Sequence, residues 1–159
     1  MNQSTKELSH NSEVQTYRRF PFVVEKGKGS WVFTDEGEKY LDLYGGHAVT
    51  GTGHCHPRVV AAIKGQAETM LFYSNLVYMK VRAEAASLLV KKLPDNLDKV
   101  FFVNSGTEAN ENAIKIARKI TGRETILSFE GGFHGRTMAS AGATGIKKVR
   151  EAVSPLAPA

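Results

Sequence analysis

Residues 103–110 read VNSGTEAN and join a short apolar run, residues 99–103, to an amphipathic helical pattern from about Thr107 to Thr121. A small-residue turn between a strand and a helix leaves backbone N–H groups unpaired at the positive end of the helix dipole. A helix N-terminus of this kind attracts a phosphate. The usual nucleotide loops, GxxxxGK[ST] and GxGxxG, do not occur in the sequence. The stretch by itself therefore indicates a phosphate site of unidentified kind.

A second interpretation of the same residues needs no ligand. Ser105 and Glu108 have the S-x-x-E spacing of a capping box. In that motif each side chain binds the backbone N–H of the other residue, so both residues are explained by helix formation alone. The local pattern leaves both interpretations open.

Composition limits the classes of function. The chain has 159 residues, a length sufficient for one domain with a hydrophobic core. Of these residues 42% are hydrophobic and 23% are charged, as in a globular protein. No apolar run is long enough to cross a bilayer, and residues 1–15 lack the apolar segment of a secretory signal. The net charge of +5 is scattered, so we expect no nucleic-acid partner and no membrane partner. A single cysteine, Cys55, is typical of a reducing compartment and predicts a cytoplasmic protein.

Strand patterns dominate the first part of the chain after a polar arm, residues 1–20. β-rich runs occur at Val23–Val24, Ser30–Thr34 and Lys39–Leu43, separated by glycines and by the turn DEG at 35–37. These runs predict two or three antiparallel strands.

Helices and strands alternate in the rest of the chain. Pro57 marks the first position of a helix, whose apolar face comprises Val59, Val60, Ile63, Ala67, Met70 and Leu71. A second helix is expected from Val81 to Leu93, with Ala85, Leu88 and Leu89 facing inward, and a third from Thr107 to Thr121, closed by Gly122. Strands are expected at 99–103 and 125–129, and a loop at 154–159. The alternation predicts an α/β layer with parallel strands.

The stretch GHCHP at 53–57 contains possible zinc ligands, but three neighbouring residues cannot easily converge on one tetrahedral ion. We therefore expect a turn from a strand into a helix, and no metal. The glycines of YGGH at 44–47 predict close backbone packing.

Five blocks occur in a characteristic order: WVFTDEG at 31–37, YLDL at 40–43, GHCHP at 53–57, NSGTEAN at 104–110 and FHGRT at 133–137. In this order they resemble the class III pyridoxal-phosphate aminotransferases, and most closely the acetylornithine and ornithine aminotransferases. The resemblance runs from about Phe22 to Pro155. It implies an α/β fold, namely an incomplete PLP-transferase fold of type I. In that fold, N-terminal antiparallel strands are followed by the start of the large-domain sheet, which is parallel or mixed and is accompanied by helices. Residues 1–50 would form the arm and part of the small domain, and residues 51–159 the truncated N-terminal part of the PLP-binding large domain.

The resemblance also implies site residues. Ser105, Gly106 and Thr107 would hold the phosphate of pyridoxal 5'-phosphate, because glycine permits close backbone approach and threonine adds a hydroxyl donor. Phe133 would stack on the cofactor ring, the alternative being a core phenylalanine under the loop. Arg136 would bind the substrate carboxylate through its planar guanidinium, the alternative being a solvated loop arginine.

Two groups that transamination needs lie further downstream in the family: a Schiff-base lysine and a carboxylate beside the pyridinium nitrogen. This chain has no lysine in that context. Lys147 and Lys148 lie in a charged amphipathic stretch that predicts a surface. We therefore expect no catalytic residue in this chain and no activity from the chain alone.

The resulting prediction is the N-terminal part of an aminotransferase that acts between acetylornithine- or ornithine-like amines and 2-oxoglutarate. Its partners would be a small amino acid substrate and, by family resemblance, a second copy in a homodimer. Three alternatives remain. The chain could be a non-catalytic module that binds a phosphate or PLP, or one half of a split enzyme whose C-terminal half is encoded separately. It could also be an unrelated flavodoxin-like domain.

Overall fold

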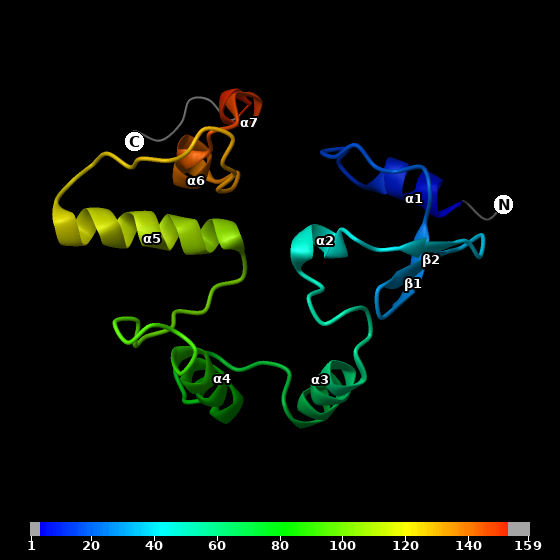
Figure 1. Ribbon diagram of the computed structural model, residues 1–159, viewed down its shortest axis with the longest axis horizontal. Helices are drawn as coiled ribbons and strands as arrows, with labels where there is room; N and C mark the ends of the chain where they lie inside the picture. The colour runs from blue at the N-terminus through cyan, green and yellow to red at the C-terminus, as the bar shows by residue number, and fades with distance from the viewer. Residues whose placement is uncertain (1–3, 153–159) are drawn as a thin grey trace. The chain divides into compact units, whose positions relative to one another are not determined.

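The computed structural model describes residues 4–152 and separates into two compact units, Met1–Tyr78 and Met79–Ala159. The first unit contains the β-strands and helices α1 to α3, and the second contains helices α4 to α7 (Figure 1). No helix within residues 4–152 is both long enough and apolar enough to cross a membrane.

The first unit is built on an antiparallel sheet of three strands in the order β1-β2-β3. The strands are β1 (Val24–Lys28), β2 (Trp31–Thr34) and β3 (Lys39–Leu41). Gly29, with φ of +58°, adopts the left-handed conformation that the tight turn between β1 and β2 requires. The predicted antiparallel strands are confirmed, but two bounds differ: β1 runs through Gly27 to Lys28, beyond the predicted Val23–Val24, and β3 ends two residues before the predicted Leu43.

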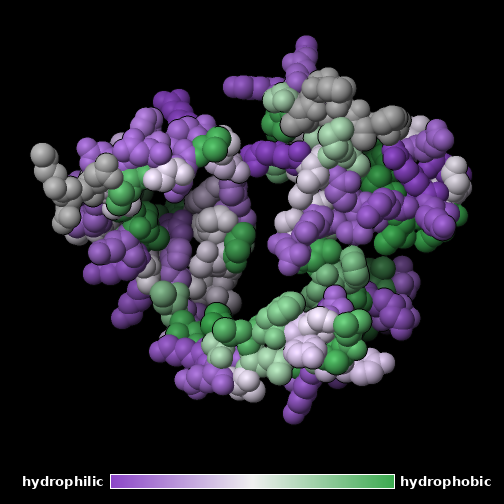
Figure 2. Space-filling view, turned by 180° about the vertical axis from the view of Figure 1, so that it is seen from behind, coloured by the Kyte–Doolittle hydropathy of each residue, from purple (hydrophilic) through white to green (hydrophobic). Residues whose placement is uncertain are grey.

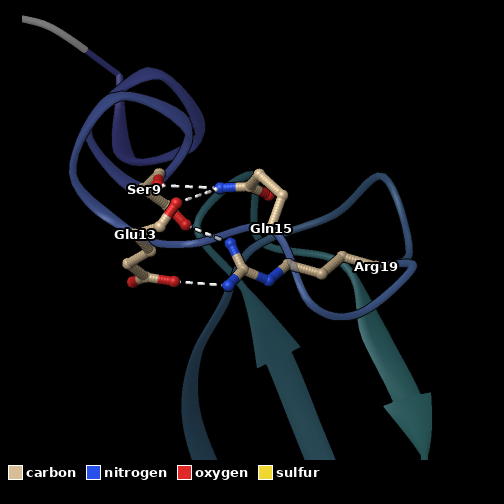
Figure 3. Close-up of polar contacts among 4 residues, drawn as sticks. All are labelled: Ser9, Glu13, Gln15 and Arg19. Atoms are coloured by element: carbon tan, nitrogen blue, oxygen red, sulfur yellow. Dashed lines mark hydrogen bonds and ion pairs between the residues drawn. The ribbon is translucent and has the colours of Figure 1, made fainter. Parts of the chain in front are cut away.

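The polar arm contains a short helix, α1 (Thr5–Ser12), and the chain folds back after it. Gln15 Nε2 donates hydrogen bonds to the carbonyl oxygens of Ser9 and Glu13, at 3.2 and 2.9 Å. The Arg19 guanidinium contacts the Ser9 hydroxyl and the Glu13 carboxylate, as Figure 3 shows. These contacts hold the arm against the end of its own helix.

A left-handed turn follows the sheet. Helix α2 (Gly45–Ala48) has positive φ at all four residues, from +56° to +61°. A Cβ at Gly45 would meet nothing within 4 Å, and a Cβ at Gly46 would meet only the Thr50 hydroxyl at 3.8 Å. The prediction of close packing around these glycines was therefore wrong, and the positive φ explains them instead.

The turn before α3 (Pro57–Thr69) is tied to the end of the sheet. Asp42 Oδ1 accepts the N–H groups of Tyr44 and Gly45 at 3.0 and 2.8 Å, and Asp42 Oδ2 lies 2.6 Å from His54 Nε2. Pro57 occupies the first turn of α3, as predicted. The GHCHP stretch is thus the predicted turn into a helix.

The second unit contains α4 (Lys80–Val90), α5 (Gly106–Thr121), α6 (Met138–Ala143) and α7 (Lys147–Glu151). Helix α5 begins at Gly106, one residue before the predicted Thr107, and ends at the predicted Thr121, where Gly122, with φ of +69°, is the C-cap. Helix α6 packs against α5, and α7 packs against α6.

The strands predicted at 99–103 and 125–129 are not formed, so this part of the prediction was wrong. A strand needs a neighbour that takes up its N–H and C=O groups, and among the described residues no segment forms a β-ladder with either run. The side chains of Phe101, Leu127 and Phe129 are 68%, 92% and 89% exposed, so they also lack apolar cover.

Few side chains are buried among the described residues, and Figure 2 shows hydrophobic residues at the surface. The apolar face of α3 is open, with Val59 and Ile63 41% and 63% exposed. The predicted inward orientation of Leu88 and Leu89 on α4 is wrong, since they are 62% and 47% exposed. Neither helix packs on another described element of its own unit, which explains the exposure of both faces. In the second unit the core lies where α5 meets α6, and it comprises Ile114, Ser140, Ala141 and Thr144.

Candidate functional site

The N-terminus of α5 is capped in a way that differs from the predicted box by one residue. Ser105 Oγ accepts the N–H of Glu108 at 3.3 Å, as a capping box requires. The Glu108 carboxylate, however, accepts the N–H of Asn104 at 2.7 Å, one residue before the expected Ser105. This bond from the Asn104 backbone is the main cause that lowers the pKa of Glu108.

The cap leaves two backbone donors of α5 unused. The N–H of Glu108 is bonded to the Ser105 hydroxyl, and the N–H of Ala109 to the Ser105 carbonyl. The N–H groups of Gly106 and Thr107 have no acceptor within the part of the chain that the structure describes. The cap and a phosphate site therefore do not compete, because they use different donors of the same helix end.

These two N–H groups lie at a cleft of about 440 Å³ that is lined by residues of the NSGTEAN and FHGRT motifs. All five residues predicted for the site are brought together there. The residues that line the cleft are Ser105, Gly106, Thr107, Asn110, Phe133, His134, Gly135, Arg136 and Thr137.

Hydrogen bonds hold the FHGRT loop over the helix end. Asn110 Nδ2 donates to the carbonyl oxygen of His134 at 2.6 Å, and the His134 N–H donates to Thr144 Oγ1 at 3.1 Å. The Thr144 hydroxyl, fully buried, donates to the carbonyl oxygen of Ser140 at 3.0 Å. Neither Asn110 nor Thr144 was predicted from the sequence to have a role. Asn110 and Thr144 both contact His134, which is 24 and 10 residues away in the sequence, and sequence spacing does not reveal these contacts.

Glu111 connects α5 to the start of α6. Its Oε1 accepts the Thr137 hydroxyl at 2.5 Å and the N–H groups of Ala139 and Ser140, both at 3.0 Å. The bond from Thr137, followed by those from the backbone, holds the pKa of Glu111 below its ordinary value. Glu111 was also missed, although its position four residues after Thr107 places both on one helix face.

Phe133 and Arg136 lie together at the cleft. The Arg136 guanidinium carbon is 5.3 Å from the centre of the Phe133 ring, which is within the range of a cation–π contact. The Phe133 side chain is 51% exposed, so it is not the core residue that the alternative interpretation required. The pair provides a flat aromatic surface and a planar cation beside the helix end.

A metal centre has no support in residues 4–152, where no group of three His, Cys, Asp or Glu side chains is placed to hold an ion.

Solved structures define the class of this fold. An omega transaminase from Pseudomonas jessenii, in complex with PMP, matches 98% of this chain with a TM-score of 0.90 and 26% identity. A taurine:2-oxoglutarate aminotransferase from Bifidobacterium kashiwanohense, in complex with PLP and glutamate, matches 96% with a TM-score of 0.86 and 30% identity. This chain covers 38% and 36% of those two chains. The predicted fold class is confirmed: the chain has part of the α/β fold of the PLP-dependent transaminases, fold type I.

Sequence comparison gives the family. Residues 13–159 match the family model described as Aminotransferase class-III, and the chain belongs to that family. The acetylornithine aminotransferases of Methanopyrus kandleri and Methanothermobacter thermautotrophicus are 50% and 47% identical to it, over 96% and 94% of its length. The chain spans 39% and 38% of those two relatives, as their N-terminal part.

Proposed function

We infer that this chain is the N-terminal part of an aminotransferase that uses pyridoxal 5'-phosphate. The enzyme would move an amino group between an acetylornithine- or ornithine-like amine and 2-oxoglutarate. The observation that carries the proposal is the pair of unused N–H donors, those of Gly106 and Thr107, at a cleft that also contains Phe133 and Arg136. The names of the relatives support the choice of substrates.

The residues of the cleft fit the cofactor. Its volume of about 440 Å³ lies within the range of small-molecule sites, roughly 300–1,000 Å³. The N–H groups of Gly106 and Thr107 suit the phosphate, while Ser105 maintains the helix end that presents them. The exposed ring of Phe133 suits the flat heteroaromatic ring. When bound, pyridoxal 5'-phosphate supplies the electron sink for the reaction.

Arg136 would bind the carboxylate of the amino acid substrate. A guanidinium presents two parallel N–H donors to a carboxylate and stays charged at every working pH. Because it lies 5.3 Å from the Phe133 ring, the carboxylate would be held beside the cofactor ring and would orient the amine toward it.

The chain alone would not turn over substrate. Lys147 and Lys148 are exposed on α7, and Lys147 Nζ lies 3.7 Å from the Glu151 carboxylate, so neither is placed in the cleft. We propose that the remainder of the enzyme supplies the reactive lysine, whether on the same or a separate chain. We also propose a cytoplasmic homodimer, with residues 1–50 in the small domain and 51–159 in the large domain.

Removing one main-chain donor tests the cofactor site. Gly106→Pro eliminates an N–H at the first helical position, where proline is well tolerated, and extended Ser105 is compatible with a following proline. Gly106→Ala is the matched control, since a Cβ there meets nothing within 4 Å and the N–H remains.

We expect Gly106→Pro to bind pyridoxal 5'-phosphate about tenfold more weakly than Gly106→Ala in a fluorescence titration, because a hydrogen bond to a charged group is lost. Equal affinities would remove this N–H from the site. No binding by the parent chain would contradict the proposed cofactor cradle.

A further inference from the structure

Three side-chain oxygens form a row between α5 and α6. The hydroxyl oxygens of Thr107 and Thr137 lie 2.8 Å apart, and the Thr137 oxygen lies 2.5 Å from Glu111 Oε1. Thr107 and Glu111 are four residues apart on α5, whereas Thr137 is the residue that precedes α6. The row therefore connects the NSGTEAN helix to the FHGRT loop.

The hydrogens in this row can be arranged in only one way while Glu111 is ionised. A carboxylate only accepts hydrogen bonds, and a hydroxyl has one hydrogen to donate. Thr137 therefore donates its hydrogen to Glu111. The short contact between the two hydroxyls then requires Thr107 to donate to Thr137.

This arrangement limits what Thr107 can offer a phosphate. A phosphate ester near neutral pH acts mainly as an acceptor, so it needs donors. The only hydrogen of the Thr107 hydroxyl is used by Thr137, whereas the backbone N–H of Thr107 has no acceptor among the described residues.

We propose that Glu111 is a positioning residue: through Thr137 it turns the Thr107 hydroxyl away from the phosphate, which the N–H groups of Gly106 and Thr107 then hold. The phosphate part of this proposal rests on the proposed function. Three donors satisfy the same Glu111 oxygen, which limits the repulsion between its charge and a nearby phosphate.

The first test measures the dissociation constant of pyridoxal 5'-phosphate for Thr107→Val, which keeps the branched shape and loses the hydroxyl. We expect less than a threefold change in the wild-type background. In a Thr137→Val background the hydroxyl of Thr107 has lost its acceptor and can turn to the phosphate. There the same Thr107→Val change should weaken binding about tenfold. A similar effect of Thr107→Val in both backgrounds, whether large or small, would overturn the proposal.

The second test needs no ligand, so it separates this proposal from the proposed function. Hydrogen exchange of the Ala139 and Ser140 amides is compared between Glu111→Gln, which keeps an acceptor oxygen, and Glu111→Ala, which has none. We expect at least tenfold faster exchange in Glu111→Ala and near wild-type exchange in Glu111→Gln. Unchanged exchange in both variants would refute the anchoring role of Glu111. If the wild-type chain does not bind the cofactor, the proposed function and the phosphate part fall, while exchange still decides the role of Glu111.

Discussion

Gly135 lies directly against Thr107: a Cβ at residue 135 would be 2.1 Å from Oγ1 of Thr107 and 2.6 Å from its Cβ. Gly135 also has φ of +136°, which side-chain-bearing residues rarely adopt. The FHGRT loop can therefore lie on the start of α5 only because this residue has no side chain. The contact joins the two motifs that form the cleft.

Gly135→Ala should accordingly destabilise the second unit. Backbone strain and overpacking each cost about 1–3 kcal/mol, so we expect a loss of about 2–4 kcal/mol in the free energy of unfolding, measured with urea and circular dichroism. Gly142→Ala is the control, because it lies in α6 with open space around a Cβ. That change should be neutral or stabilise by up to about 1 kcal/mol. Equal effects of the two substitutions would contradict the tight contact with Thr107.

Substitutions of Ser105 distinguish its role in the helix cap from its place in the proposed phosphate site. Ser105→Ala removes the acceptor of the Glu108 N–H and should cost about 1 kcal/mol of α5 stability. Ser105→Asp keeps a side-chain acceptor for the Glu108 N–H, but it replaces the hydroxyl that donates to the Glu108 carboxylate at 3.2 Å, so part of the cap stability is lost. Its negative charge should also weaken binding of pyridoxal 5'-phosphate. The helical content and the dissociation constant of the two variants check this prediction, and unchanged cofactor affinity in Ser105→Asp would place the phosphate elsewhere.

The sequence predicted those helix and strand ends that are set by residues at the ends themselves. Ser105 and Gly122 marked both ends of α5, and Pro57 marked the start of α3. The positive φ of Gly29 fits the hairpin that the glycines between the strand patterns indicated. Each of these residues acts on its own neighbours, so a single sequence contains the information.

Features that depend on distant partners were not predictable in the same way. An apolar run such as 99–103 forms a strand only if another segment pairs with it, and the run itself does not reveal whether one does. Thr144 and Glu111 are polar residues with no distinctive spacing. The Glu111 contact with Thr137 exists only once the start of α6 lies against α5. The Thr144 contact with the His134 N–H forms only once the FHGRT loop has folded back on the end of α6.

Acid should weaken the turn after the sheet in the first unit. The N–H of Gly45, then the bond with His54 and the N–H of Tyr44, hold the pKa of Asp42 below its ordinary value of 3.8. A carboxylate with a lowered pKa contributes stability above its unfolded pKa and loses it as the pH falls through the folded value. The stability difference between wild type and Asp42→Asn should therefore shrink as the pH falls from about 5 to about 3. Thermal melts across this range check the prediction, and a difference that grows in acid would contradict it.

Arg136 can be tested once activity is restored. The chain would be mixed with the segment of the Methanopyrus kandleri acetylornithine aminotransferase that follows the matching region, since that relative is 50% identical. If the cleft is a genuine cofactor cradle, the mixture should retain pyridoxal 5'-phosphate through gel filtration and transaminate acetylornithine. Either segment alone is the control, and it should not turn over substrate.

Arg136→Lys then separates substrate binding from cofactor binding. Lysine keeps the positive charge but loses the planar pair of donors that matches a carboxylate. The guanidinium lies beside Phe133, whereas the proposed phosphate donors are at the start of α5. The substitution should therefore lower kcat/KM by at least tenfold while bound cofactor stays at the wild-type level. Equal loss of cofactor and turnover would make Arg136 a structural residue of the loop. Turnover at the wild-type rate would remove it from the substrate site, and the carboxylate would then have to be bound by a residue outside this chain's cleft.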